Sequence, residues 1–384
     1  MPATPLQILV IGQTPPIPGS ALQQILDCFL AHGGQVTLGD PAPDIVLFDS
    51  YRMEEQLGAH IEQQHPNAMR LLAVSHLQSL RDAREALLRR RLVMGLDPND
   101  FRELFATSGS DLYQQMAPTD LAQREIAAIH RCDLSLVASD VEIDLLVNGF
   151  GVPPDLLQWC PPMLPAPQAT PPFGEREHLV SFVDCRDPAD WDAVLWLKHN
   201  IWPMTRRHLP DAQLHLYCAS PTEKALALHD PAGGLLILER SEDPLQVMAR
   251  ARLCLSPLRF GAGTKDVLAS AMRAGTPAIT TPIGSEAMHG NQAWPGLVSG
   301  TAEGLAKAAI SLYGDEARWN QAQRDARQVL ERHFDPRWHS NALARRIEQT
   351  LGGLADQRLY NFTGAMLRNL RRQASRAGAA GRCP

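Results

Sequence analysis

The residues best suited to hold a ligand lie within residues 252–290, where glycines and cations alternate. Gly261 and Gly263 let the backbone turn sharply and approach a ligand without a Cβ in the way. Arg259 precedes this turn and Lys265 follows it, so two full positive charges flank it. A helix that begins after the turn presents unpaired N–H groups and a partial positive charge. The pattern therefore predicts an anion site suited to a diphosphate, with an ordinary crossover and its glycine turn as the alternative.

Regular elements on both sides of the glycines must position this site. The expected order is strand, glycine loop, helix, strand and loop: Leu253–Leu258, Gly261–Gly263, a helix that Thr264 caps and Gly275 ends, Pro277–Thr281, and Gly284–Glu286. The first strand is a short apolar run, which is typical of a buried strand. A threonine directly before an amphipathic helix can accept a hydrogen bond from an N–H of the first turn. Such a unit carries its loops at the carboxyl ends of its strands, where ligands bind in open α/β sheets.

The rest of the chain also alternates short strands with helices. We expect strands at Leu6–Gly12, Gln35–Gly39, Ile45–Phe48, Arg70–Val74 and Asp133–Ser139, and further strands at His178–Val183, Gln213–Tyr217 and Leu235–Leu238. A proline-rich stretch at residues 161–172 separates the two sets and is interpreted as a linker, because prolines cannot sustain a helix. The alternation predicts an α/β protein with two doubly wound sheets.

Composition and charge exclude several classes of protein. The chain has 384 residues, enough for two α/β domains, and its formal net charge of −6 gives no reason to expect nucleic-acid binding. Its seven cysteines show no metal-ligand or redox spacing and mostly lie in apolar runs, which indicates buried thiols in a reducing cytoplasm. The N-terminus lacks the pattern of a signal peptide, and no apolar run approaches the ~20 residues that span a bilayer.

The sequence PLRFGAGTK, a helix that ends in AMRAGTP, and the following TTPIGSE resemble the donor-nucleotide signature of the family-four (group 1) glycosyltransferases. The resemblance is good over residues 179–346 and looser over the first half. It implies the GT-B fold, in which two Rossmann-like domains face a cleft and the C-terminal one binds the nucleotide. It also implies an enzyme that moves a sugar from a nucleotide sugar to a glycoconjugate or other acceptor, with retention, without an obligatory metal and without another cofactor.

The resemblance assigns roles to individual residues. His76 would touch the donor sugar, while Arg259 and Lys265 would stabilise the charge that grows on the leaving diphosphate, so these three are the expected catalytic residues. The donor would also contact Gly261, Gly263, Thr264, Ser270, Gly284, Ser285 and Glu286. The acceptor would contact Gln13, Thr14 and Gly19, which lie in the loop after the first strand.

Two positions depart from the family pattern. Ser270 occupies the place of a glutamate that usually accepts hydrogen bonds from the donor ribose, and the usual glycine-rich loop after the first strand of the second domain carries Asp184 and Arg186. Because of these changes, the alternative is a non-catalytic protein of the same fold that serves binding or assembly. A sugar-nucleotide epimerase shares the fold but needs an acid–base pair that we do not find. The segment Asp190–Asp192 spells a metal-binding pattern of another fold, but helix capping explains it better.

The expected domains are an acceptor domain at residues 1–165, a nucleotide-sugar domain at residues 166–350 and a basic tail at residues 351–384. From Gln357 on, the tail contains six arginines and no acidic residue. It is interpreted either as a solvated helix or as a peripheral contact with anionic lipid at the inner membrane face. The partners expected for the protein are therefore a nucleotide-sugar donor and an acceptor in the cytoplasm, with no nucleic acid.

Overall fold

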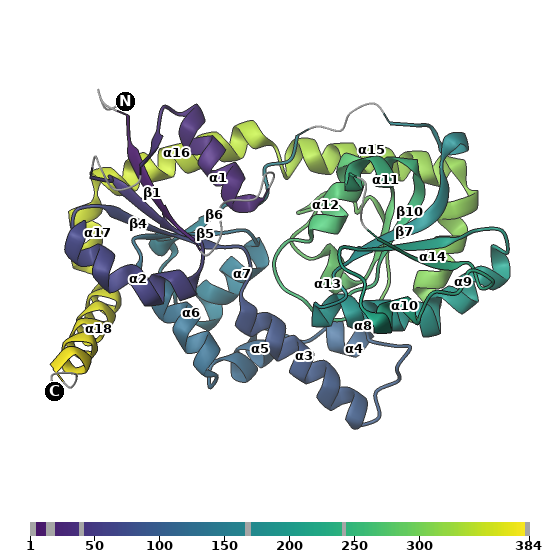
Figure 1. The fold of residues 1–384 in the computed structure, drawn as a ribbon, viewed down its shortest axis with the longest axis horizontal. Coiled ribbons are helices and arrows are strands. Elements are labelled where there is room, and N and C mark those ends of the chain that lie inside the picture. Colours follow the sequence, from purple (N-terminus) through teal and green to yellow (C-terminus); the bar gives the residue numbers. More distant parts are fainter. Residues whose placement is uncertain (1–4, 13–19, 38–41, 166–169, 240–242, 381–384) are drawn as a thin grey trace. The chain divides into compact units, whose positions relative to one another are not determined.

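The computed structural model describes residues 5–12, 20–37, 42–165, 170–239 and 243–380, with side chains up to residue 374. The chain divides into two compact units. The N-terminal unit comprises residues 1–79, 109–163 and 336–384, and the C-terminal unit comprises residues 80–108 and 164–335. Each unit contains one parallel sheet with helices on both of its faces (Figure 1). This architecture confirms the predicted fold class of two Rossmann-like α/β domains.

Six parallel strands form the sheet of the N-terminal unit in the order β2-β1-β3-β4-β5-β6. Their bounds are β1 Gln7–Ile11, β2 Gln35–Thr37, β3 Ile45–Phe48, β4 Met69–Val74, β5 Leu134–Val137 and β6 Leu157–Trp159. The helices are α1 Ala21–Ala31, α2 Tyr51–Gln64, α5 Gly109–Met116, α6 Asp120–Arg131, α7 Asp140–Asp144, α16 Pro336–Gly352, α17 Leu354–Tyr360 and α18 Phe362–Ala380, with short turns at Leu145–Gly149 and Pro154–Leu156. Every residue of β3 and β5 is buried, as central strands of a parallel sheet require.

The C-terminal unit repeats this plan with the strand order β12-β11-β10-β7-β8-β9. Its strands are β7 Glu177–Val183, β8 Leu214–Cys218, β9 Leu235–Glu239, β10 Ala251–Ser256, β11 Ala278–Thr280 and β12 Gly296–Val298. Its helices are α3 Gln78–Val93, which begins at the boundary, α4 Arg102–Phe105, α8 Pro188–Trp196, α9 Trp202–His208, α10 Glu223–Leu226, α11 Pro244–Arg250, α12 Asp266–Arg273, α13 Pro282–Ser285, α14 Ala302–Gly314 and α15 Glu316–Arg332, with short turns at Phe173–Glu175 and Leu197–Ile201. All the strands expected from the sequence are present and differ only at their ends.

The expected domain boundaries need two corrections. Residues 80–108, expected in the first domain, belong to the C-terminal unit, because Phe101 is fully buried there against the ring of Trp196, with centroids 5.1 Å apart. Residues 336–384 belong to the N-terminal unit rather than to the second domain and a separate tail. In Figure 1, α16 and α17 accordingly lie beside the sheet of this unit, and α18 packs against α6 and α2.

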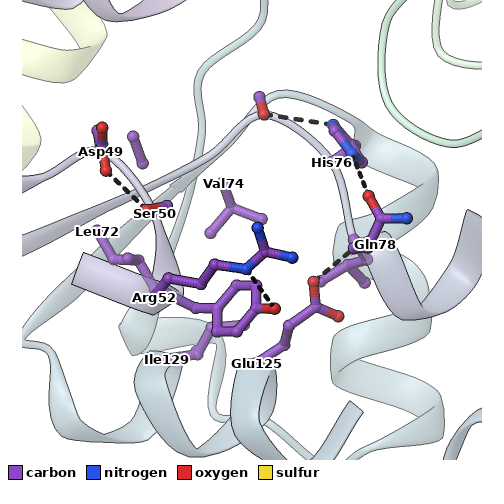
Figure 2. A pocket seen from close by; sticks show the side chains of 13 residues that line it. Asp49, Ser50, Arg52, Leu72, Val74, His76, Gln78, Glu125 and Ile129 are labelled. Carbon is purple, nitrogen blue, oxygen red and sulfur yellow. Dashed lines mark hydrogen bonds between the residues drawn. The ribbon is translucent and has the colours of Figure 1, made fainter. Parts of the chain in front are cut away.

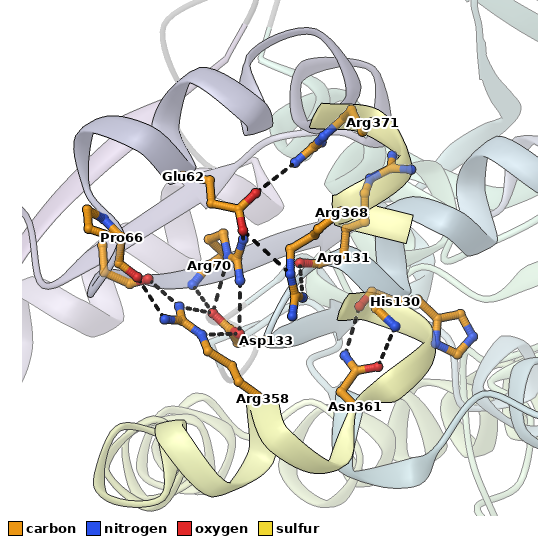
Figure 3. A network of polar contacts seen from close by, with 12 residues as sticks. Glu62, Pro66, Arg70, His130, Arg131, Asp133, Arg358, Asn361, Arg368 and Arg371 are labelled. Atoms are coloured by element: carbon orange, nitrogen blue, oxygen red, sulfur yellow. Dashed lines mark hydrogen bonds and ion pairs between the residues drawn. The ribbon is translucent and has the colours of Figure 1, made fainter. Parts of the chain in front are cut away.

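The arginines of the C-terminal helices explain the second correction. Arg358 of α17 binds the buried carboxylate of Asp133 through Nη2 at 2.7 Å (Figure 3). Arg371 of α18 binds Glu54 through Nη1 at 2.6 Å. Burial alone would raise the pKa of Asp133, but the hydrogen bond from Arg358 and the charge of Arg70 outweigh it and lower that pKa. Arg358 and Arg371 therefore attach α17 and α18 to the N-terminal unit. The sequence alone suggested that the basic residues of this segment face solvent or lipid, and these two do not.

Candidate functional site

The strand order of the C-terminal unit reverses direction at one point, and such a point is a common ligand-binding position. The chain runs from β7 outwards through β8 to β9 and then returns to β10 on the other side of β7. Ligands of open α/β sheets bind at such a reversal, outside the carboxyl ends of the strands. Residues 184–187 follow β7 there, and residues 257–265 follow β10. The glycine loop predicted from the sequence thus lies at the edge where the topology favours binding.

The glycine loop has the conformation that its composition suggests, but its helix begins later. Gly263 has a φ of +65°, in the left-handed region that favours glycine. Helix α12 begins at Asp266, Lys265 stands at the N-cap position, and no side chain caps the helix. The predicted cap by Thr264 is therefore wrong. A helix N-terminus attracts an anion through its partial positive charge even where no side chain caps it.

Arg259 lies beside the loop with its charge already paired. Its Nε donates to Asp192 of α8 at 2.7 Å and its Nη2 donates to the same carboxylate at 2.5 Å. The guanidinium also lies over the rings of Phe101 and Trp196, at 4.9 and 5.5 Å from their centroids. In the structure as it stands, Arg259 is thus fixed by an ion pair and two aromatic rings inside the C-terminal unit.

Lys265 is turned toward the backbone of the two loops. Its buried Nζ donates to the carbonyl oxygen of Gly263 at 2.6 Å and to that of Glu286 at 3.4 Å. The ammonium therefore bridges the glycine loop and the loop after β11. This contact supports the shape of the site and gives Lys265 a structural task that the sequence does not reveal.

Arg84 is the residue that the sequence analysis missed. It comes from α3, and its guanidinium donates to both carboxylate oxygens of Glu286, at 2.9 and 2.7 Å. Its Nη1 also donates to the carbonyl oxygen of Gly261 at 2.8 Å. A second cation besides Lys265 therefore contacts the glycine loop, and it is supplied by a helix far away in the sequence. The only signal for it was the strongly charged character of α3, which is typical of many exposed helices.

The loop after β11 is closely packed. A Cβ at Gly284 would come within 1.8 Å of the Thr280 hydroxyl oxygen, so no larger residue fits. Thr281 caps α13 by accepting a hydrogen bond from the N–H of Gly284 at 3.2 Å. Ser285 is buried, and its hydroxyl donates to the carbonyl oxygen of Pro282 at 3.3 Å. The structure thus brings Glu286 to the glycine loop through Lys265 and Arg84, while Gly284 packs against Thr280 and the Ser285 hydroxyl turns back on its own helix.

The two departures from the family pattern have distinct settings. Asp184 is exposed after β7 and accepts a hydrogen bond from the N–H of Arg186 at 2.9 Å. Asp190 accepts one from the N–H of Asp184 at 2.8 Å, and burial, helped by neighbouring carboxylates, raises the pKa of Asp190 to about 6. Ser270 is half-buried on α12 between buried Ala269 and Ala271.

The Asp190–Asp192 segment has structural partners. Asp190 accepts a hydrogen bond from the loop after β7, and Asp192 forms the ion pair with Arg259. In the described part of the chain, no group of three His, Cys, Asp or Glu side chains could hold a metal.

His76 lies in the N-terminal unit, on a pocket of about 300 Å³ at the carboxyl ends of β3 and β4 (Figure 2). Its ring nitrogens lie 3.4 Å from the Ser75 hydroxyl and 3.3 Å from Oε1 of Gln78. Buried Glu125 fixes the same loop by accepting hydrogen bonds from the N–H groups of Gln78 and Ser79, at 2.8 and 3.1 Å. The pocket is lined by Asp49, Ser50, Tyr51, Arg52, Leu72, Ala73, Val74, Ser75, His76, Leu77, Gln78, Glu125 and Ile129. Of the other residues expected in this unit, Gln13, Thr14 and Gly19 lie outside the described residues.

Comparison with known proteins agrees with this geometry. Residues 180–315 match the family described as glycosyl transferases group 1. The structure of Anabaena Alr3699/HepE with UDP-glucose has a TM-score of 0.60 at 14% identity, over 90% of this chain and 100% of that one. Sucrose-phosphate synthase of Thermosynechococcus elongatus has a TM-score of 0.60 at 13% identity, over 91% of this chain and 100% of that one.

A third similar structure is a variant of S. aureus TarM, in complex with Fondaparinux, alpha-GlcNAc-glycerol and UDP. Its TM-score is 0.57 at 12% identity over 79% of this chain, which spans only 55% of TarM. No curated protein sequence matches the chain. The family match and the fold nevertheless define the class of protein: residues 180–315 form a group 1 glycosyltransferase domain within a GT-B fold. The prediction of a group 1 glycosyltransferase domain in a GT-B fold is confirmed at this level.

Proposed function

We propose that this chain transfers a sugar, with retention at the anomeric carbon, from a nucleotide sugar held by the C-terminal unit to an acceptor held by the N-terminal unit. The observation that carries the proposal is the group 1 glycosyltransferase match over the unit whose glycine loop lies at the reversal of strand order. HepE was solved with UDP-glucose and TarM with UDP, so uridine nucleotides are the first donors to test.

In the proposed reaction the bond between the anomeric carbon and the diphosphate breaks. Negative charge grows on the leaving phosphate, and oriented N–H groups lower the barrier if they contact that charge more strongly in the transition state. The N-terminus of α12, with its partial positive charge, is suited to this task. Lys265 contributes positive charge beside the same loop, and Arg84 holds that loop in place through its bond to Gly261 and its ion pair with Glu286. No metal enters this scheme.

The acceptor side of the proposal rests on the pocket around His76. Its lining combines the apolar side chains of Leu72, Val74 and Ile129 with polar side chains. A sugar offers both a hydrophobic face and hydroxyls, so it suits a pocket with mixed walls of this kind. We therefore propose a glycoconjugate acceptor in the cytoplasm.

A thermal-shift titration with UDP-glucose, UDP, ADP-glucose and GDP-mannose tests the donor side directly. A ligand that binds the native state raises the unfolding midpoint by mass action. We expect one nucleotide sugar to stabilise the chain, and release of its nucleoside diphosphate on addition of acceptor would establish turnover. Stabilisation by a nucleotide sugar, with no nucleoside diphosphate released by either transfer or slow hydrolysis, would favour the non-catalytic alternative. Absence of stabilisation by every nucleotide would contradict the proposal.

A peripheral membrane contact through α17 and α18 is a second part of the proposal. Phe362, Met366 and Leu370 follow one another at the spacing of one helical face, and each is exposed. Arg372 is exposed beside them and suits anionic headgroups. Within the described residues, no helix is long and apolar enough to cross a bilayer. We expect the chain to sediment with phosphatidylglycerol vesicles and Met366→Ser to weaken this binding, whereas equal binding of both proteins would contradict the contact.

A further inference from the structure

Two cysteines far apart in sequence meet in the C-terminal unit. Cys218 is the last residue of β8, and Cys185 lies just beyond the end of the neighbouring strand β7, where Val183 pairs in register with Cys218. Their Sγ atoms are 2.6 Å apart. Both side chains are free thiols in the structure, Cys185 with 9% of its surface exposed and Cys218 with none.

Apolar side chains pack against the pair in the described part of the chain. The two side chains form a small cluster with buried Ala225, against which the half-buried Val183 and Trp191 pack. A cluster of this kind can be filled by ordinary hydrophobic side chains, and cysteine often serves as one. Here, however, the two sulfurs need to approach by only about 0.5 Å to reach the ~2.05 Å of a disulfide bond.

We propose that Cys185 and Cys218 are a reversible modification site that forms a disulfide with a low-molecular-weight disulfide as oxidant. The Cys185 thiolate attacks one oxidant sulfur, forms a mixed disulfide and releases one thiol. The Cys218 thiolate then attacks Sγ of Cys185 and displaces the second thiol. The pair loses two electrons and two protons, and the oxidant becomes two thiols. Cys185 reacts first because it is the more exposed of the two.

The rate of this exchange depends on the thiolate. Burial, together with the contact with Cys218, raises the pKa of Cys185 to about 12. The thiol form therefore dominates at neutral pH, and the attacking thiolate becomes more abundant as pH rises. The disulfide consequently forms slowly at neutral pH and faster at alkaline pH, so the pair responds to sustained oxidation.

The disulfide would affect the proposed function because it would restrain the loop of residues 184–187. Residues 184–187 lie on the ligand-binding edge of the sheet, and β8 lies on the opposite side of β7 from β10. A bond from Cys185 to Cys218 holds this loop toward β8 and prevents it from moving toward the glycine loop after β10. On the basis of the proposed donor site, oxidation therefore weakens nucleotide-sugar binding several-fold.

The test treats the full-length chain with oxidised glutathione or with dithiothreitol and maps the peptides under non-reducing conditions. We expect one cross-linked peptide pair that joins Cys185 to Cys218, and a rise of several degrees in the unfolding midpoint of the oxidised chain, since the bond closes a loop in the unfolded state. Cys185→Ala should abolish both effects, whereas Cys160→Ala, which removes a buried cysteine of the N-terminal unit, should leave them intact.

The outcomes separate this inference from the proposed function. Cross-linking of other cysteines, or none between Cys185 and Cys218 even at alkaline pH, overturns the modification site whether or not a donor binds. A specific cross-link in a chain that binds no nucleotide in either redox state contradicts the proposed function and leaves the modification site standing. Equal donor affinity of the reduced and cross-linked chains overturns the control of the donor loop.

Discussion

The ion pair between Arg84 and Glu286 should stabilise the C-terminal unit and hold the glycine loop in place. Its side chains are only 10% and 16% exposed, and three hydrogen bonds from Arg84 join α3, the glycine loop and the loop after β11. Removal of one partner leaves the other charge poorly solvated, which costs 3–5 kcal/mol in a fully buried pair. Because water reaches part of this pair, we expect Arg84→Met or Glu286→Gln to cost about 2–4 kcal/mol.

The double variant sharpens the expectation. Loss of both charges removes the uncompensated group, so Arg84→Met with Glu286→Gln should be less damaging than the sum of the single changes, with a coupling of about 2–3 kcal/mol. Urea unfolding followed by tryptophan fluorescence is a suitable assay. Most of the reporting side chains lie in the C-terminal unit: Trp191, Trp196, Trp202, Trp294 and Trp319.

A matched control lies on the same helix. Arg89 pairs with Glu85 one turn away, but its side chain is 75% exposed, so Arg89→Met should cost less than about 1 kcal/mol. Glu286→Gln should also tighten binding of a nucleoside diphosphate several-fold, because it leaves the charge of Arg84 at the loop unneutralised. Single costs no larger than that of the control, or strictly additive variants, would refute the structural role that we assign to Arg84.

Three further changes have distinct expected results. Arg259→Ala should destabilise the C-terminal unit by about 2–4 kcal/mol in urea unfolding, because it leaves the Asp192 carboxylate without its partner, and unchanged stability would contradict this role. Asp190 keeps its proton up to about pH 6 when folded but only to about pH 4 when unfolded, so its contribution to stability is lost as pH rises through this window. Asp190→Asn should therefore flatten that pH dependence and raise stability at pH 7 by about 1–3 kcal/mol, whereas an unchanged profile would show that Asp190 titrates normally. Sugar transfer should persist in excess EDTA, since the proposed mechanism uses no metal, and its loss would require a metal step.

The sequence predicted those features that depend on local pattern. The apolar runs at β7 and β10, the glycine turn and the strand after α12 each carry their signal within a few residues, and each is present in the structure. Thr264 was misjudged because a threonine before a helix resembles a cap, and only the actual start of α12 at Asp266 shows otherwise.

The missed features are contacts between distant segments. Arg84 and Glu286 are 202 residues apart, and nothing in the local pattern of α3 links it to the glycine loop. Cys185 and Cys218 also have no recognisable spacing, since their contact arises from the pairing of β7 with β8. Likewise, the basic C-terminal segment looked solvated because its acidic partners, Glu54 and Asp133, precede it by more than two hundred residues.

Substitutions at Ser270 test whether the C-terminal unit has a functional donor site or one that has lost its donor contacts. Ser270 is half-buried on α12, whose first turn lies at the glycine loop, so a longer side chain there can extend toward a ribose bound at that edge. A glutamate accepts stronger hydrogen bonds from ribose hydroxyls than a serine, because its oxygens are charged. If the remaining contacts are intact, Ser270→Glu should tighten nucleotide-sugar binding by about 1–2 kcal/mol, or roughly five- to thirtyfold. Ser270→Gln is the matched control, since it has the same length without the charge.

Calorimetric titration of the three proteins with one donor decides between the readings. A gain for Ser270→Glu that Ser270→Gln only partly reproduces would show that the carboxylate is what the site lacks. Equal gains for both variants would assign the effect to side-chain length. Weaker binding by Ser270→Glu, together with lower stability, would mean that the carboxylate is buried without a partner and that other donor contacts are missing as well. That result would favour a glycosyltransferase fold that is kept for binding or assembly.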